Sequence, residues 1–148
     1  MKNGWYNNNN DYFTSRLLHN GTRQQFVMFA SNMGGGRYNI AAGIFPYQAT
    51  LNSIRKNYDD IWESPTSTNK KVSMYSITCA LDCLKEVEEA ITERANGKRR
   101  LIEVDGMDYR RLHAYTRILT KEKYGYKVSS VKSPSCNLHI LIKTINAK

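Results

Sequence analysis

The sequence lacks the features on which several classes of protein depend. It has three cysteines in 148 residues, too few for the disulfide framework of a small secreted domain. No apolar run approaches the roughly 20 residues that a membrane-spanning helix needs, and the first residues lack the apolar region of a signal peptide. We therefore expect a soluble cytoplasmic protein with reduced thiols and no membrane partner.

Groups that could hold a metal ion or perform catalysis are also sparse. Cys79 and Cys83 have the i, i+4 spacing of one helix face, but the chain has only three histidines and no second cysteine pair. No serine has nucleophile-elbow spacing, and the glycines lack the pattern of a P-loop or a dinucleotide-binding loop. The sequence predicts no metal, no cofactor and no enzymatic activity.

What the sequence has in excess is positive charge, unevenly distributed. Its 22 lysines and arginines and 13 acidic residues give a net charge of +9. Residues 1–58 hold six basic residues and one acidic residue, a net charge of +5. Residues 59–97 hold four basic and eight acidic residues, a net charge of −4, and residues 98–148 hold twelve basic and four acidic residues, a net charge of +8. Such a protein is expected to bind a polyanion, and its 41% hydrophobic content is typical of a globular fold.

Hydrophobic periodicity predicts an α+β fold, with a mainly antiparallel sheet and about three helices in the order ββα(β)αβαββ. Residues 1–15, rich in asparagine and aromatics, are predicted to be a flexible tail whose aromatics dock on the domain or stack on unpaired bases. Residues 16–148 are predicted to form one domain. The expected elements are strands at 25–31 and 38–45, a helix at 47–62, a short strand at 71–76, a helix at 78–95, a strand at 101–104, a helix from 108, and strands at 127–131 and 137–145. The helix at 78–95 is expected to turn its glutamates, Glu86 among them, to water and to end at Asn96-Gly97.

A glycine-rich segment, residues 32–37, joins the first two expected strands. Its three consecutive glycines accept positive φ, which predicts a hairpin turn. A glycine turn also leaves its backbone accessible, so that a phosphate chain could lie against it with Arg37 at the rim. Arg37 is therefore a candidate nucleic-acid contact.

Residues 98–126 contain most of the candidate binding residues. The stretch begins with three basic residues, continues as a strand and turns into a predicted helix. Basic residues recur along that helix at spacings that place them on one face, as in a nucleic-acid-binding surface, although a solvated helix face is the alternative. The candidate nucleic-acid-binding residues are Arg37, Lys98, Arg99, Arg100, Arg110, Arg111, His113, Arg117, Lys121 and Tyr124.

Residues 78–145 have the order helix, strand, helix, strand, strand, with paired arginines and a histidine at the second helix. This segment resembles the small single-stranded nucleic-acid-binding domains named for an Arg-x-x-x-His signature, found in bacterial Jag-type proteins. The resemblance implies that Arg110, Arg111 and His113 contact the phosphate backbone, although here two residues rather than three separate Arg110 from His113. The small, basic, Asn-rich chain is also similar to bacteriophage accessory proteins.

The sequence thus predicts a non-catalytic, largely sequence-tolerant binder of single-stranded nucleic acid, RNA ahead of DNA. Tyrosines near the arginines, such as Tyr38 and Tyr126, are expected to stack on unpaired bases. Two alternatives stay open. Residues 99–126 resemble the acyl-CoA-binding part of acetyltransferases without its phosphate-loop motif, and the acidic helix at 78–95 could dock a protein partner or a second copy.

Overall fold

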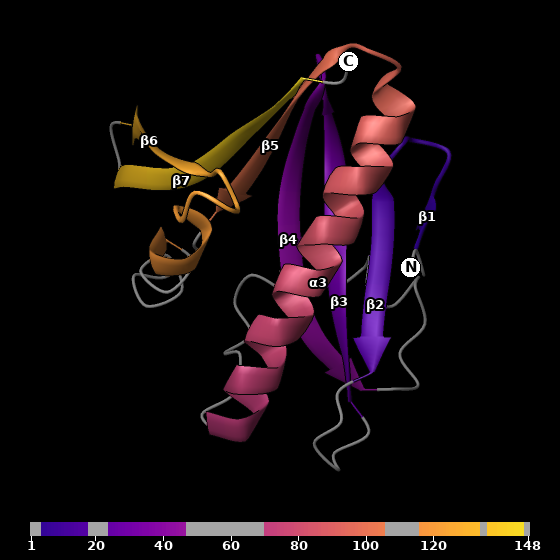
Figure 1. Cartoon of the computed structure of the whole chain (residues 1–148), viewed down its shortest axis with the longest axis vertical. Coiled ribbons are helices and arrows are strands. Elements are labelled where there is room, and N and C mark those ends of the chain that lie inside the picture. The colour runs from indigo at the N-terminus through magenta and orange to yellow at the C-terminus, as the bar shows by residue number, and fades with distance from the viewer. Residues whose placement is uncertain (1–3, 18–23, 47–69, 106–115, 134–135, 147–148) are drawn as a thin grey trace. The chain divides into compact units, whose positions relative to one another are not determined.

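The structure is a computed structural model, which describes residues 4–17, 24–46, 70–105, 116–133 and 136–146 (Figure 1). It confirms an α+β fold with a seven-stranded, mostly antiparallel sheet of strand order β1-β2-β3-β4-β5-β7-β6. Of the described pairings, β4 with β5 is parallel, and the pairs β1–β2, β2–β3, β5–β7 and β6–β7 are antiparallel. The elements are β1 (Trp5–Tyr6), β2 (Tyr12–Leu17), β3 (Gln24–Gly34), β4 (Arg37–Pro46), α3 (Lys70–Ala95), β5 (Arg99–Asp105), β6 (Lys127–Ser133) and β7 (Cys136–Asn146).

The helices differ from the expected three. The described residues contain one long helix, α3, and a short helical turn at 116–119. The strand predicted at 71–76 is wrong, because those residues belong to α3. Strand propensity depends strongly on context, whereas extending a helix adds a hydrogen bond per residue without new nucleation. The helix predicted at 47–62 lies outside the described residues, as do residues 106–115.

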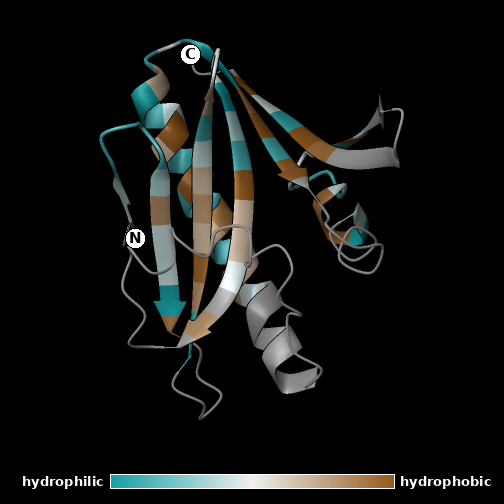
Figure 2. Cartoon of the chain, turned by 180° about the vertical axis from the view of Figure 1, so that it is seen from behind, coloured by the Kyte–Doolittle hydropathy of each residue, from teal (hydrophilic) through white to brown (hydrophobic). Residues whose placement is uncertain are grey.

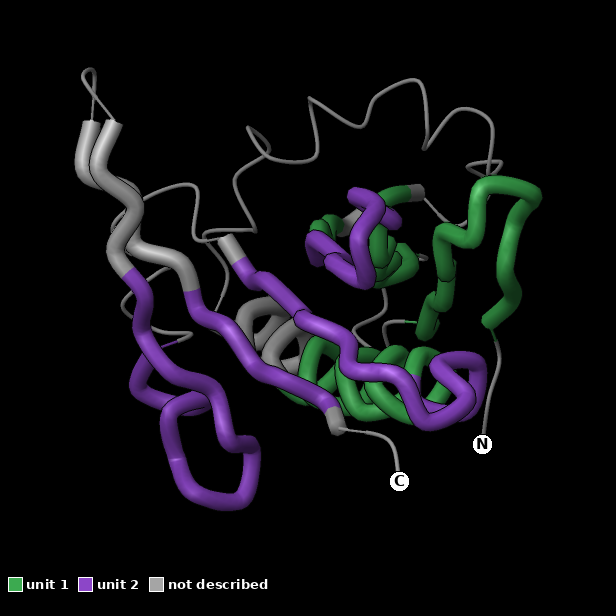
Figure 3. Tube along the Cα trace, turned by 90° about the horizontal axis from the view of Figure 1, so that it is seen from above, with its two compact units in different colours: residues 1–31, 41–91 green, residues 32–40, 92–148 purple. Residues whose placement is uncertain are grey.

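The chain divides into two compact units (Figure 3). Unit 1 comprises Met1–Ser31 and Ala41–Ile91, and unit 2 comprises Asn32–Ile40 and Thr92–Lys148. Strands β3 and β4 and helix α3 therefore each contribute residues to both units. We describe each unit by itself.

In unit 1, α3 lies across one face of β2 and β3 (Figure 1). The aromatic side chains of Tyr12, Phe13, Phe26 and Phe29 are buried in this unit. Figure 2 shows the apolar central part of β3. Phe13 and Phe29 are directly paired on β2 and β3, their ring centroids are 4.3 Å apart, and Phe13 is only 2% exposed. The ring of Trp5 stacks on Phe13 with a centroid distance of 6.1 Å.

These contacts correct the prediction of a flexible tail over residues 1–15. Within the described part of that stretch, Trp5–Tyr6 and Tyr12–Leu17 are strands of the sheet. The expectation that the aromatics dock on the domain is confirmed for Tyr12 and Phe13, which are both buried. The reason is the large apolar area of the aromatic rings, whose burial favours docking. The asparagines between them form the turn that joins β1 to β2, in which the amide of Asn10 donates to the carbonyl of Asn7 at 3.1 Å.

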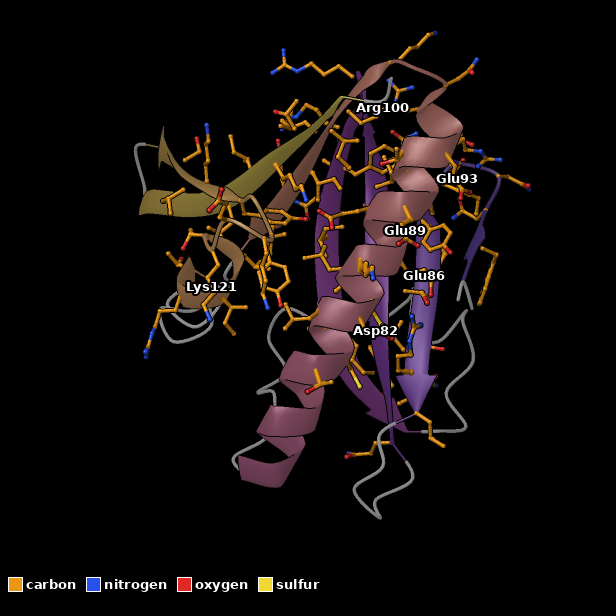
Figure 4. The ribbon with its side chains drawn as sticks, in the orientation of Figure 1. Asp82, Glu86, Glu89, Glu93, Arg100 and Lys121 are labelled. Carbon is orange, nitrogen blue, oxygen red and sulfur yellow. The ribbon has the colours of Figure 1, made fainter. Side chains whose placement is uncertain are left out.

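Unit 1 also contains a buried ionic network. Glu86 of α3 was expected to face water but is 3% exposed. One of its oxygens accepts a hydrogen bond from the Tyr12 hydroxyl at 2.6 Å, and the other accepts one from Nη2 of Arg16 at 2.8 Å. Nε of Arg16 also donates to Asp82 at 2.6 Å. Figure 4 labels Asp82 and Glu86 on α3. Arg16 therefore compensates two carboxylates of α3, which a helical wheel cannot reveal because the arginine is on another element.

The network changes how nearby groups titrate. Burial opposes the charge of Arg16, but its hydrogen bonds to Asp82 and Glu86 more than offset this and raise its pKa. Burial, followed by the hydrogen bond to Glu86, raises the pKa of Tyr12. Burial raises the pKa of Cys83 to about 12, although Arg16 acts in the opposite direction. Cys83 is therefore an inert thiol at neutral pH, and Cys79 and Cys83 are both free, as expected.

In unit 2, β5 pairs with the first four residues of β4 and with β7, which also pairs with β6. Ile102 and Leu141 are completely buried, and Leu119 and Tyr126 of the segment before β6 are also buried. The predicted end of α3 at Asn96-Gly97 is confirmed. Both residues have positive φ, and the amide of Lys98 donates to the carbonyl of Ala95 at 3.0 Å.

Candidate nucleic-acid interface

The net positive charge belongs entirely to unit 2. By sequence, unit 2 contains 14 basic and five acidic residues, a net charge of +9. Unit 1 contains the remaining eight basic and eight acidic residues, a net charge of zero. A polyanion would therefore be attracted to unit 2 in particular.

The predicted glycine hairpin is confirmed as a tight turn. Gly35 and Gly36 connect β3 to β4 with φ values of 62° and 79°, as a type I′ turn requires at its two central residues. A Cβ atom at Gly35 would meet no atom within 4 Å. At Gly36 it would lie 3.1 Å from the carbonyl oxygen of Arg99, so this glycine also permits close approach to β5.

The turn brings Arg37 next to the basic start of β5. Arg37 pairs with Leu101, and the amide of Leu101 donates to the carbonyl of Gly36 at 2.9 Å. Lys98 and Arg99 are exposed, whereas Arg100 is half-buried and donates through Nη1 to the carbonyl of Arg99 at 3.0 Å. The structure thus gathers Arg37, Lys98, Arg99 and Arg100 at one end of unit 2.

Arg37 is not a solitary cation. Its Nε and Nη2 both donate to Oε1 of Glu103 on β5, at 2.9 and 2.8 Å. The Arg37 side chain is 55% exposed and that of Glu103 is 11% exposed, so a largely buried carboxylate orients an accessible guanidinium. Sequence reasoning did not select Glu103. Its only local signal was a charged residue inside the apolar stretch 101–104, which indicates a partner on another strand.

The other candidates lie elsewhere. Arg117 and Lys121 are exposed, and Figure 4 shows Lys121 far from Arg100 within unit 2. Arg110, Arg111 and His113 lie outside the described residues. The described candidates of unit 2 therefore lie in two places, at the β4–β5 end and at residues 117–123.

The described tyrosines offer little for base stacking. Tyr38 and Tyr126 are 7% and 3% exposed, and Nζ of Lys143 lies 5.5 Å from the centre of the Tyr126 ring. Tyr124 is half-buried, with Nζ of Lys123 at 4.9 Å from its ring centre. These parts of unit 2 therefore present exposed cationic groups more than exposed aromatic faces.

The described residues contain no group of three metal-binding side chains, and no described helix is long and apolar enough to cross a membrane. The described candidates at the β4–β5 end are arginines, a lysine and the backbone of a glycine turn, groups suited to binding phosphate. No protein-family model, curated protein or solved structure matches this chain.

Proposed function

We propose that this protein binds single-stranded nucleic acid, with RNA as its main ligand, through the cationic surface of unit 2 and without catalysis. The observation that supports the proposal most strongly is the charge difference between the units, +9 against zero. Lysine and arginine contacts to phosphates supply most non-specific affinity for nucleic acids, which fits a largely sequence-tolerant binder.

The proposal is tested by filter binding of a labelled single-stranded RNA across a range of salt concentrations. Binding should weaken steeply as salt rises, because bound cations release counterions from the RNA. Parallel titrations with single-stranded DNA and duplex RNA rank the ligands. Absence of binding at low salt, or binding independent of salt, would contradict the proposal.

A matched pair of exposed lysines tests the role of unit 2. Lys121→Ala removes a charge from unit 2, and Lys85→Ala removes the same charge from unit 1. The first change should lower the salt slope by about 1, as expected for a lost phosphate contact, and the second should leave it nearly unchanged. Equal effects would show that total charge, not the surface of unit 2, determines affinity.

An acyl-CoA-dependent acetyltransferase is the second candidate. One observation favours it: β4 and β5 form a parallel pair, and in open α/β sheets ligands bind beyond the carboxyl ends of the parallel strands. Thermal unfolding with acetyl-CoA or with RNA separates the two candidates. A marked rise in melting temperature with acetyl-CoA, and none with RNA, would favour the enzyme.

A further inference from the structure

We infer that the nucleic acid contacts one particular face of the sheet in unit 2, on which Arg37 and Arg99 are the phosphate-binding residues. We call it the Arg37–Arg99 face. This inference rests on the proposed function and specifies which arginines carry it out. The residues of the face are Arg37, Asn39, Arg99, Leu101, Glu103, Ile142 and Thr144.

Strand register defines the face. Side chains alternate between the two faces along a strand, and directly paired residues share a face. Arg37 pairs with Leu101 and Asn39 with Glu103, so the odd-numbered residues of β5 lie on the face of Arg37. On β7, Thr144 and Ile142 join them as partners of Leu101 and Glu103. Arg99 therefore shares a face with Arg37, whereas Arg100 lies on the opposite face.

Exposure distinguishes the two faces. On the opposite face Ile102, Val104, Tyr38 and Ile40 are all buried. On the Arg37–Arg99 face the side chains of Arg37, Arg99 and Thr144 are exposed, and those of Asn39, Leu101 and Ile142 are half-buried. The Arg37–Arg99 face offers a ligand exposed cations, with polar and apolar side chains beside them for contact with sugars, whereas Arg100 and Lys143 on the opposite face are half-buried.

Glu103 positions one of these cations. Because Arg37 pairs with Leu101, it lies diagonally between Arg99 and Glu103 on β5. Both of its bonds to Glu103 go to a single oxygen and use Nε and Nη2. Nη1 has no hydrogen-bond partner among the described residues. The guanidinium is thus held by one edge and can offer Nη1 to a phosphate, while Arg99 supplies a second cation on the neighbouring strand.

Two adjacent arginines provide a matched test. Arg99→Ala and Arg100→Ala remove the same charge at neighbouring positions on opposite faces. In filter binding with single-stranded RNA, Arg99→Ala should weaken affinity roughly tenfold and lower the salt slope by about 1. Arg100→Ala should weaken affinity less than about twofold. Arg99→Lys should recover part of the loss, because it restores the charge without the planar guanidinium.

The outcomes separate this inference from the proposed function. Equal losses for Arg99→Ala and Arg100→Ala, or a larger loss for Arg100→Ala, would overturn the assignment of the face and leave RNA binding intact. Absence of RNA binding by the unaltered protein would overturn both. Unchanged melting temperatures of both variants establish that the comparison reports on binding rather than on folding.

Discussion

In unit 1 eight basic residues are balanced by eight acidic ones, whereas unit 2 has 14 basic and five acidic residues. The same residue type also serves different purposes in the two units. Arg16 of unit 1 has a side chain only 15% exposed and pairs with Asp82 and Glu86. Arg37 of unit 2 pairs with one carboxylate and remains 55% exposed. The net charge of the whole chain is therefore a weaker guide to a binding surface than the position of the cations that carboxylates do not neutralise.

The largest expected effect separates a structural arginine from a binding one. Arg16→Ala leaves Glu86 buried without its cation, which should lower the free energy of unfolding by about 3–5 kcal/mol. Arg99→Ala should change it by less than about 0.5 kcal/mol, because Arg99 is exposed. Urea denaturation measures both.

For RNA affinity we expect the opposite order, with the larger loss in Arg99→Ala and the smaller loss in Arg16→Ala. At a temperature where Arg16→Ala remains folded, its affinity should match that of the unaltered protein, while Arg99→Ala binds more weakly. If the two variants lost equal stability, the distinction between the units would be broken. Adding Glu86→Gln to Arg16→Ala should recover part of the stability, since it removes the unpaired charge.

Alkaline pH should destabilise the protein through unit 1. The pKa of Cys83 rises from an ordinary value of 9.0 to about 12, and that of Tyr12 is also raised. Above pH 9 the unfolded chain therefore loses a proton that the folded chain retains, so the stability present below pH 9 declines as pH rises toward 12. The decline should be at most about 1.4 kcal/mol per pH unit for each group.

Urea denaturation at pH 7, 9 and 10 measures this decline. Cys83→Ser should reduce the decline between pH 9 and 10, because, of the described thiols, only Cys79, whose pKa burial also raises, then contributes before Tyr12 begins to contribute above its ordinary value of 10.0. A stability that does not change between pH 7 and 10 would contradict the burial of Cys83.

Removing the carboxylate that orients Arg37 should tighten RNA binding. Glu103→Gln keeps an acceptor for Arg37 but removes a negative charge from the Arg37–Arg99 face. Affinity at low salt should increase roughly threefold to tenfold, and the increase should disappear at high salt. The control is Glu93→Gln, the same change at an exposed residue on α3 of unit 2. Equal increases would show that the gain is not specific to the face.

The smallest effect concerns the glycine turn. Gly35→Asn produces the Asn-Gly pair favoured by type I′ turns, so stability should change by less than about 0.5 kcal/mol. Gly36→Ala should cost about 1–2 kcal/mol, because it combines positive φ with a Cβ that crowds the Arg99 carbonyl. RNA affinity should stay within twofold for Gly35→Asn. A larger loss would mean that the turn itself, rather than the Arg37–Arg99 face, contacts RNA.

Much of the fold could be predicted because its signals are local. The alternation in residues 25–31 and 38–45, the three glycines between them and the Asn96-Gly97 stop each depend on neighbouring residues, and the structure confirms all of them. The strand at 71–76 was wrong because an extended helix outweighed local strand propensity. The position of Arg37 beside Lys98–Arg100 in the candidate site could not be predicted. It results from the pairing of β4 with β5, which no local sequence pattern encodes.

The sequence by itself determined the excess of positive charge and most of the strands, since both follow from composition and short-range periodicity. Only the tertiary structure decided that the excess belongs to unit 2, that Glu86 is buried beside Arg16, and that Arg37 and Arg99 share a face. Arg37 and Glu103 are 66 residues apart in the chain. The register between their strands depends on contacts between residues distant in sequence, so no helical wheel or alternation pattern could place these two side chains together.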